Sequence, residues 1–132
     1  MADQDYTLTI TLDAGPDEAE RRVREVLQEQ GFGVLSEIDV QQALRDKLGE
    51  EIGAYKILGA CNPPLAKQAI DADPDVGALL PCNVLLRANP AGGTDVAAAD
   101  PRAMLALGPK ALGPVAEEAR ERLERALASL QG

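Results

Sequence analysis

The residues best suited to chemistry are two Cys-Asn dipeptides, Cys61-Asn62 and Cys82-Asn83. The first lies where a predicted strand ends and a helix begins, and the second lies at the start of the next predicted strand. Free N–H groups and the dipole of a helix N-terminus favour a thiolate, which makes Cys61 the best reactive-group candidate and suits an anionic ligand near Asn62. Simple burial in the core is the alternative for both cysteines, because cysteine is among the most buried residue types.

Two charged residues, Lys56 and Glu37, form a second candidate group on neighbouring predicted strands. An ordinary cross-strand ion pair is the simpler interpretation, because such pairs are common at protein surfaces. Enclosed in a pocket, the same pair would bind a polar ligand or tune a proton transfer.

Several kinds of active site are excluded because their residues are absent. The chain has no histidine, which removes Ser-His and Cys-His catalysis and histidine-ligated metals within one chain. Its two serines, Ser36 and Ser129, do not lie in a G-x-S-x-G motif. The Gly31-Phe32-Gly33 segment precedes a predicted strand, whereas a nucleotide-binding glycine motif opens a helix. We therefore expect no nucleotide cofactor and no other cofactor.

Length and charge indicate one acidic domain spanning residues 1–132. This length is typical of a single domain, and 45% hydrophobic residues supply a core. That core is aliphatic, since Tyr6, Phe32 and Tyr55 are the only aromatic residues. A formal net charge of -9 disfavours nucleic acid and anionic membranes as partners.

The two cysteines and the start of the chain together predict a cytoplasmic location. Two cysteines are too few for the disulfide framework of a small secreted domain, so both are expected to be thiols. The first residues are polar, and no run approaches the roughly 18 apolar residues of a membrane span.

Alternating and helical periodicities predict the order β-α-β-α-β-α-β-β-α. The predicted strands cover residues 6–12, 32–38, 54–61, 82–88 and 94–99. The four predicted helices of this order cover residues 16–30, 40–48, 62–73 and 114–130, and a further short helix is expected at residues 104–107, just before the last. The fold class is therefore α+β, a two-layer α/β sandwich whose mixed sheet is related to the ferredoxin-like pattern and is covered by helices.

This order has a consequence for the two cysteines. If strand 54–61, its following helix and strand 82–88 form a parallel βαβ unit, Cys61 and Cys82 lie at opposite edges of the sheet. A six-residue strand spans roughly 20 Å, whereas the Cα atoms of a disulfide lie within about 7 Å. An intrachain disulfide or shared metal is then excluded, and only a dimer would bring the two together.

Three segments resemble the DUF302 family: G-F-G-V-L-S-E-I-D-V from Gly31, K-I-L-G-A-C-N-P-P-L-A from Lys56 and L-L-P-C-N-V from Leu79. The resemblance runs from the first helix to the last. It implies an α+β fold, a homodimer and a family without an assigned biochemical role. It also places both Cys-Asn dipeptides, Lys56 and Glu37 inside family-defining segments.

Three functions from different classes remain open. The leading hypothesis is a homodimeric small-ligand-binding or accessory module, in which Cys61 and Asn62 contact the ligand, Lys56 and Glu37 support them, and Cys82 and Asn83 complete the site. The second is a thiol-dependent redox enzyme or a soft-metal (Cu/Zn) protein that uses Cys61 with Cys82 of a second subunit. The third is a structural interaction protein that pairs through its last helix.

Overall fold

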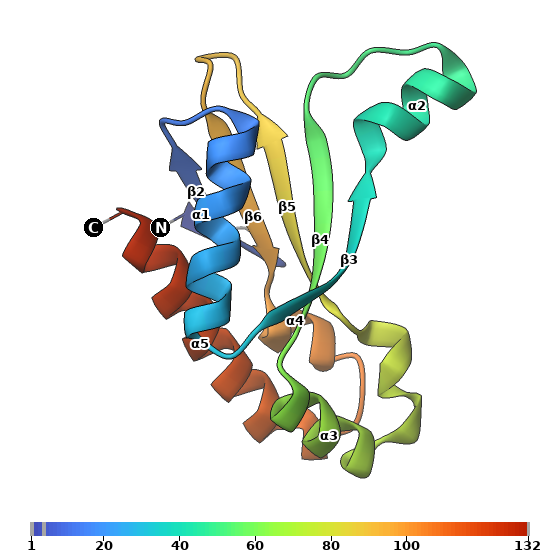
Figure 1. The fold of residues 1–132 in the computed structure, drawn as a ribbon. Helices are drawn as coiled ribbons and strands as arrows, with labels where there is room; N and C mark the ends of the chain where they lie inside the picture. The colour runs from blue at the N-terminus through green and yellow to red at the C-terminus, as the bar shows by residue number, and fades with distance from the viewer. Residues whose placement is uncertain (1, 4, 132) are drawn as a thin grey trace.

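The sheet is antiparallel throughout the part of the chain that a computed structural model describes, residues 2–3 and 5–131. Its order is β1-β2-β6-β5-β4-β3 (Figure 1). The strands are β1 (Ala2–Asp3), β2 (Thr7–Leu12), β3 (Gly33–Asp39), β4 (Tyr55–Cys61), β5 (Cys82–Ala88) and β6 (Thr94–Ala99). All five predicted strands are present, whereas periodicity missed the two-residue β1.

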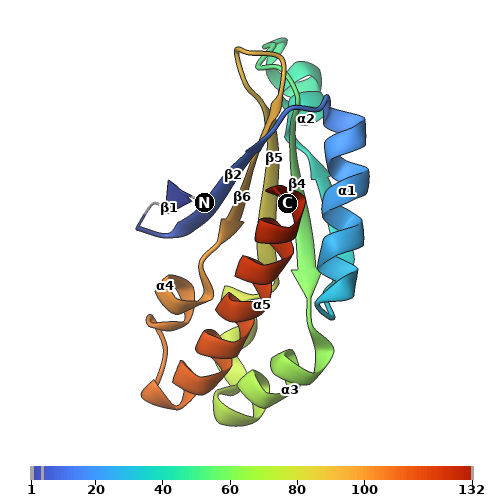
Figure 2. The same ribbon diagram turned by 90° about the vertical axis from the view of Figure 1, so that its left-hand side faces the viewer.

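Helices α1 (Pro16–Glu29) and α5 (Gly113–Gln131) cover one face of this sheet (Figures 1 and 2). Proline at the first turn begins α1, and its stripe of Ala19, Val23 and Leu27 is fully buried. On α5, Leu123 and Leu127 are also fully buried. Both stripes pack against Leu8, Val84 and their neighbours in one aliphatic core, which confirms the predicted two-layer α+β architecture.

The predicted parallel βαβ unit is wrong, and the sheet is not mixed. Strands β4 and β5 are antiparallel neighbours, and Ala60 pairs directly with Cys82. The intervening helix α3 (Pro63–Ala72) continues past the end of the sheet instead of crossing its face (Figure 1). Its buried residues Leu65 and Ala69 pack in a second core cluster with residues of α4 and α5.

That second cluster forms a small lobe at one end of the sheet. It contains α3, the 3₁₀ helices η1 (Pro74–Leu79) and η2 (Lys110–Leu112), α4 (Pro101–Leu105) and the first half of α5. Asn62 and Asp100 accept hydrogen bonds from backbone N–H groups at the starts of α3 and α4. No described helix combines the length and apolar character needed to cross a membrane.

A register shift between Val34 and Ser36 breaks the predicted alternation of strand β3. Strict alternation along residues 32–38 would place Val34, Ser36 and Ile38 on one face. In the structure Val34 packs against the core, while Ile38 pairs with Ile57 on the opposite, uncovered face and is 52% exposed. The bulge therefore turns Glu37 toward α1, where it contacts Arg24.

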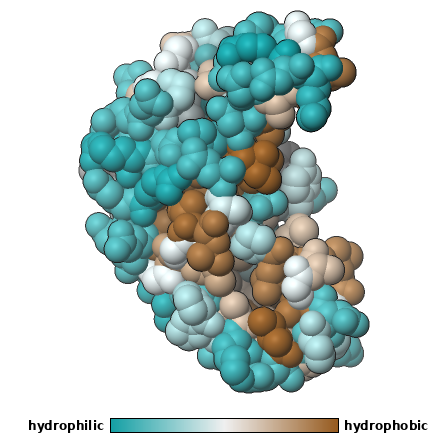
Figure 3. Space-filling view, turned by 45° about the vertical axis from the view of Figure 1, so that its right-hand side comes forward, coloured by the Kyte–Doolittle hydropathy of each residue, from teal (hydrophilic) through white to brown (hydrophobic). Residues whose placement is uncertain are grey.

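Helix α2 (Val40–Leu48) projects beyond the sheet and has no buried residue. Asp39 accepts a hydrogen bond from the Gln42 N–H at 2.9 Å, and Gly49 ends the helix in a left-handed conformation. We call α2 and the following residues 49–54 the arm. Figure 3 shows a hollowed face below the arm, with apolar residues gathered in it.

Candidate functional site

A cavity of about 160 Å³ lies where the end of the sheet meets the small lobe. Residues from the ends of β4 and β5 form one side of it, and α3, η1, α4 and α5 form the rest. We call it the end cavity. Its wall is mostly aliphatic and includes Phe32, Leu65, Ala69, Leu79, Leu105 and Val115.

Both predicted Cys-Asn dipeptides line the end cavity. Cys61 and Cys82 are half-buried free thiols on adjacent strands, and Cys82 lies opposite Ala60, the residue before Cys61. The expectation that one chain keeps the cysteines at opposite edges of the sheet is therefore wrong. It depended on parallel strands, whereas an antiparallel pair places the end of β4 beside the start of β5.

Burial makes Cys82 a poor thiolate. Removal from water disfavours the charged form and, with a smaller contribution from the neighbouring Cys61, raises the pKa of the Cys82 thiol to about 11. At neutral pH this side chain is consequently an uncharged, weakly polar part of the cavity wall.

Asn62 is held in place by the backbone on both sides. It is 5% exposed, accepts a hydrogen bond from the Leu65 N–H at 3.2 Å and donates one to the Gln30 carbonyl at 3.4 Å. Gly31 permits this approach, since a Cβ there would lie 2.9 Å from Asn62 Nδ2 and its φ of +85° favours glycine. Asn83, in contrast, is exposed at the cavity rim.

The N-terminus of α3 has no N–H group left for an anion. Pro63 and Pro64 carry none, the Leu65 N–H donates to the Asn62 side chain, and the Ala66 N–H donates to the Asn62 carbonyl at 2.8 Å. The anionic ligand suggested by the sequence therefore finds neither donors nor charge at this helix start.

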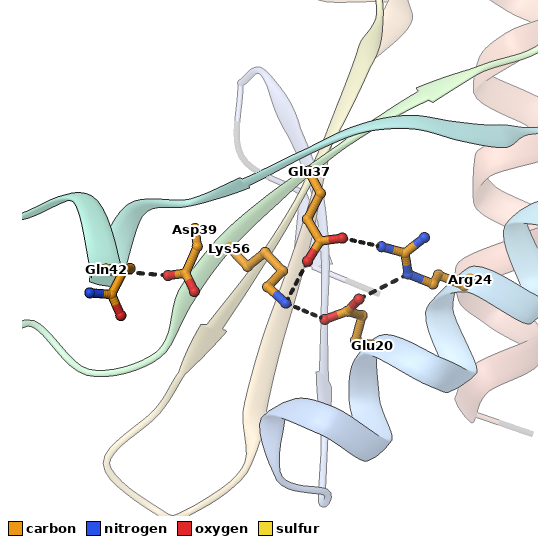
Figure 4. Close-up of polar contacts among 6 residues, drawn as sticks. All are labelled: Glu20, Arg24, Glu37, Asp39, Gln42 and Lys56. Atoms are coloured by element: carbon orange, nitrogen blue, oxygen red, sulfur yellow. Dashed lines mark hydrogen bonds and ion pairs between the residues drawn. The ribbon is translucent and has the colours of Figure 1, made fainter.

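Lys56 and Glu37 lie away from the end cavity, in a closed ring of ion pairs with Glu20 and Arg24 (Figure 4). Lys56 contacts both carboxylates at 2.8 Å, and Arg24 contacts both at 2.9 Å. Lys56 is five residues from Cys61 along β4, which corresponds to roughly 17 Å. The residues predicted to form one site therefore lie in two places. The Cys-Asn dipeptides line the end cavity, whereas Lys56 and Glu37 lie in the ring, where the ion-pair interpretation fits them.

A smaller polar cavity of about 120 Å³ adjoins the ring and includes Lys56, Glu20 and Arg87 in its wall. The ring itself offers little net charge to a ligand, because its two cations and two carboxylates neutralise one another. The Glu20–Arg24 part follows from the i, i+4 spacing in the sequence, but the approach of Lys56 to α1 does not.

Glu20 supplies a testable pH dependence. Burial alone would raise its pKa, but hydrogen bonds from Lys56 and Arg24 outweigh burial and lower it. A lowered folded-state pKa stabilises the fold above the unfolded-state pKa, near 4.3, and this contribution disappears as the pH falls through the folded-state pKa. Glu20→Gln should therefore lower the free energy of unfolding by about 1 kcal/mol at pH 7.

Urea unfolding at pH 7 and in steps below pH 4.3 measures this difference. The difference in the free energy of unfolding between the unsubstituted protein and Glu20→Gln should become smaller as the pH falls through the acid range. Glu25→Gln, which alters an exposed ion pair on the same helix, is the matched control. If this difference stays constant until the Glu20 carboxylate is fully protonated, the charge of that carboxylate is not what stabilises the ring.

Several residues of the end cavity carry no signal in the sequence. Met104, Leu105 and Val115 belong to α4 and α5, far along the chain from either Cys-Asn dipeptide. Only the arrangement of the small lobe brings them to the cavity.

Comparisons with known proteins agree with this architecture. The family model described as "Domain of unknown function DUF302" matches residues 8–130. A crystal structure of an uncharacterised conserved DUF302 protein from Bacillus stearothermophilus superimposes with a TM-score of 0.85 at 28% identity, covering 92% of this chain and 95% of that one. No functionally curated protein matches the sequence. The predicted resemblance is thereby confirmed: this chain belongs to the DUF302 family.

Proposed function

We propose that this protein is a homodimeric module that binds a small, uncharged, apolar molecule in the end cavity. The observation that carries the proposal is an aliphatic cavity of about 160 Å³ in a small domain. An engineered apolar cavity of about 150 Å³ stays dry and binds benzene. The end cavity thus has the size and surface for one small ring or branched chain.

The ligand class differs from the one that the sequence suggested. Asn62 uses its amide to fix the start of α3, and the α3 N–H groups are occupied. Cys82 carries no charge at neutral pH. A carboxylate or phosphate would lose its water without gaining partners, whereas an apolar ligand gains by leaving water.

A ligand pair tests this preference. Toluene should bind saturably and, at ten times its Kd, raise the free energy of unfolding by about 1.4 kcal/mol. Benzoate, which adds a carboxylate to a similar ring, should not bind. Thermal unfolding and isothermal calorimetry measure both.

A filled cavity should abolish toluene binding. Ala66 is half-buried in α3 and lines the cavity, so Ala66→Leu places a larger side chain there in a good helix former. Gln68→Leu, at an exposed position of the same helix, is the control and should bind as the original protein does. Equal toluene affinity in Ala66→Leu, or equal binding of benzoate, would contradict the proposal.

The arm and the uncovered sheet face support a homodimer. Leu48 and Ile52 of the arm are 67% and 47% exposed, and a nine-residue helix with no buried residue is marginally stable in water. Beside the arm, Ile38, Ile57 and Leu85 pair in one apolar row across three strands of the uncovered face. One chain therefore carries both an apolar helix and an apolar sheet row.

A second copy of the same chain is the partner that fits, because each chain then offers one arm and one apolar row to the other. In a two-fold dimer the arm of each chain covers the row of the other, as an isologous interface requires. The overall charge of -9 makes two copies repel except where uncharged surfaces meet, and the row is uncharged.

Leu48→Glu should therefore convert the dimer to a monomer in sedimentation velocity at micromolar concentration, because it places a charge in an apolar interface. Leu107→Glu is the control, since Leu107 is 76% exposed but lies in the small lobe. This interface would be refuted if the unsubstituted protein is monomeric at the same concentrations, or if the Leu48→Glu variant dimerises equally well.

A thiol-dependent redox enzyme is the second candidate, because two thiols line the same cavity. The raised pKa of Cys82 disfavours it as an attacking thiolate, so Cys61 would be the nucleophile. Alkylation by iodoacetamide at pH 7 tests this reading: modification of Cys61 no faster than that of a free thiol would remove it.

A further inference from the structure

The rim of the end cavity lies on the uncovered face of the sheet, the same face that carries the apolar row. Asn83 of β5 is exposed at this rim and pairs with Gly59 of β4. Ile57 and Leu85 of the row form the pair two residues farther along the same two strands. Because side chains two residues apart point to the same side of a strand, the rim and the row share one face.

The surface between the row and the rim is short and uncharged. Leu85 and Asn83 are about 7 Å apart along β5, since each residue of a strand advances roughly 3.4 Å. Ser36 and Pro81 lie over Gly59, where a Cβ would meet Pro81 Cγ at 2.9 Å. Pro81 also lines the cavity. The apolar row therefore continues through the Pro81 ring to the mouth of the cavity.

A helix that lies over the row must also border the cavity mouth. Figure 3 shows that the hollow over this face is bounded by the arm at its upper end and by the small lobe at its lower end. A helix with its side chains is about 10 Å across, so a helix centred on Leu85 extends about 5 Å toward the rim. The rim at Asn83 then lies within reach of its side chains.

We infer that the arm of a second copy completes the wall of the end cavity, so that ligand binding and dimerisation stabilise each other. In one chain, the mouth leaves part of a bound apolar molecule in contact with water. The arm presents Leu48 and Ile52, both exposed in one chain, and apolar side chains at the mouth remove that contact. This inference rests on the proposed function and adds a coupling between its two parts.

The coupling has a defined sign and size. Shielding roughly one methyl group of toluene from water should strengthen its binding about fourfold at each cavity. A dimer holds two cavities, and the coupling between two binding events is reciprocal. Saturating toluene should therefore lower the Kd of the dimer by the square of this factor, about 16-fold.

Calorimetry and sedimentation velocity on the full chain measure the two sides of this coupling. Toluene should bind the monomeric Leu48→Glu variant about fourfold more weakly than it binds the dimer of the unsubstituted protein. Saturating toluene should lower the Kd of the unsubstituted dimer about 16-fold, whereas benzoate should leave this Kd unchanged. Leu107→Glu, in the small lobe, is the control variant and should show the full coupling.

Sedimentation at several toluene concentrations needs no substitution, so it separates the coupling from any effect of Leu48→Glu on the fold. The inference is overturned if toluene leaves the Kd of the dimer unchanged or raises it, or if folded Leu48→Glu binds toluene as tightly as the dimer does. A protein that binds toluene and dimerises without coupling refutes this inference alone. A protein that fails to bind toluene, or fails to dimerise, refutes the proposed function as well.

Discussion

Replacing Asp100 with alanine is expected to lower the free energy of unfolding by about 3 kcal/mol, because the change removes a buried carboxylate that pairs with a buried arginine. Asp100 is 7% exposed and forms an ion pair with Arg120, whose side chain is 14% exposed. The same carboxylate accepts the Arg102 N–H at 2.9 Å and so begins α4. In the Asp100→Ala variant Arg120 still contacts Glu124. The expected loss of stability is therefore at the lower end of the range for breaking a buried ion pair.

This ion pair connects three parts of the end-cavity wall. Asp100 lies between Ala99 and Pro101, and Arg120 follows Ala119; these three neighbours all line the cavity. Asp100→Asn keeps an oxygen for the helix cap but removes the charge, so it should lose nearly as much stability as Asp100→Ala if the charge dominates.

Urea unfolding followed by circular dichroism measures both variants. Glu117→Ala is the matched control, since it breaks an exposed ion pair with Arg102 of α4 and should change the free energy by less than about 0.5 kcal/mol. A loss below about 1 kcal/mol in Asp100→Ala would mean that the pair does little to hold the lobe against the sheet.

Asn62→Ala is expected to lower the free energy of unfolding by about 2 kcal/mol, because it removes the α3 cap and a donor to the Gln30 carbonyl. Asn62→Ser should recover about half of the loss, since serine caps a helix but does not reach the carbonyl. Asn83→Ala, at the exposed rim, should have little effect on stability.

The same variants separate a structural role of Asn62 from a ligand contact. Both polar ends of its side chain are bonded to backbone groups, so folded Asn62→Ala should bind toluene with unchanged affinity. Calorimetry below the unfolding temperature measures this. An Asn62→Ala protein that is as stable as the unsubstituted protein would contradict the structural role, and one that is stable but no longer binds toluene would show that the amide serves the ligand.

Local signals predicted most helix and strand positions correctly. The Asp39–Gln42 cap and Gly49 mark α2, and Asn62-Pro63-Pro64 marks the start of α3. These succeed because capping and proline effects act within a few residues. Alternation in residues 7–12 likewise identifies β2, whose Leu8, Ile10 and Leu12 are buried.

Strand pairing could not be predicted in this way. A connection of this length that contains a helix is typical of a parallel crossover. Here the apolar side of α3 packs against η1 and α5 rather than the sheet, in a cluster that includes Leu105 and Val115 from much later in the chain. The predicted separation of Cys61 from Cys82 was wrong for the same reason, because correct strand assignments were combined with the wrong pairing, and no local pattern indicated that Met104 lines the same cavity.

The most direct test of the account is a methyl NMR titration of the protein with toluene, because it reports both binding and location. We predict saturable shifts for the methyl groups of Leu65, Met104 and Val115, which line the end cavity. The methyl groups of Leu8 and Val96, in the main core, should not shift, and Ala66→Leu should abolish the response. Unchanged cavity methyl signals at saturating toluene, or shifts confined to the uncovered sheet face, would contradict the claim that this cavity is the binding site.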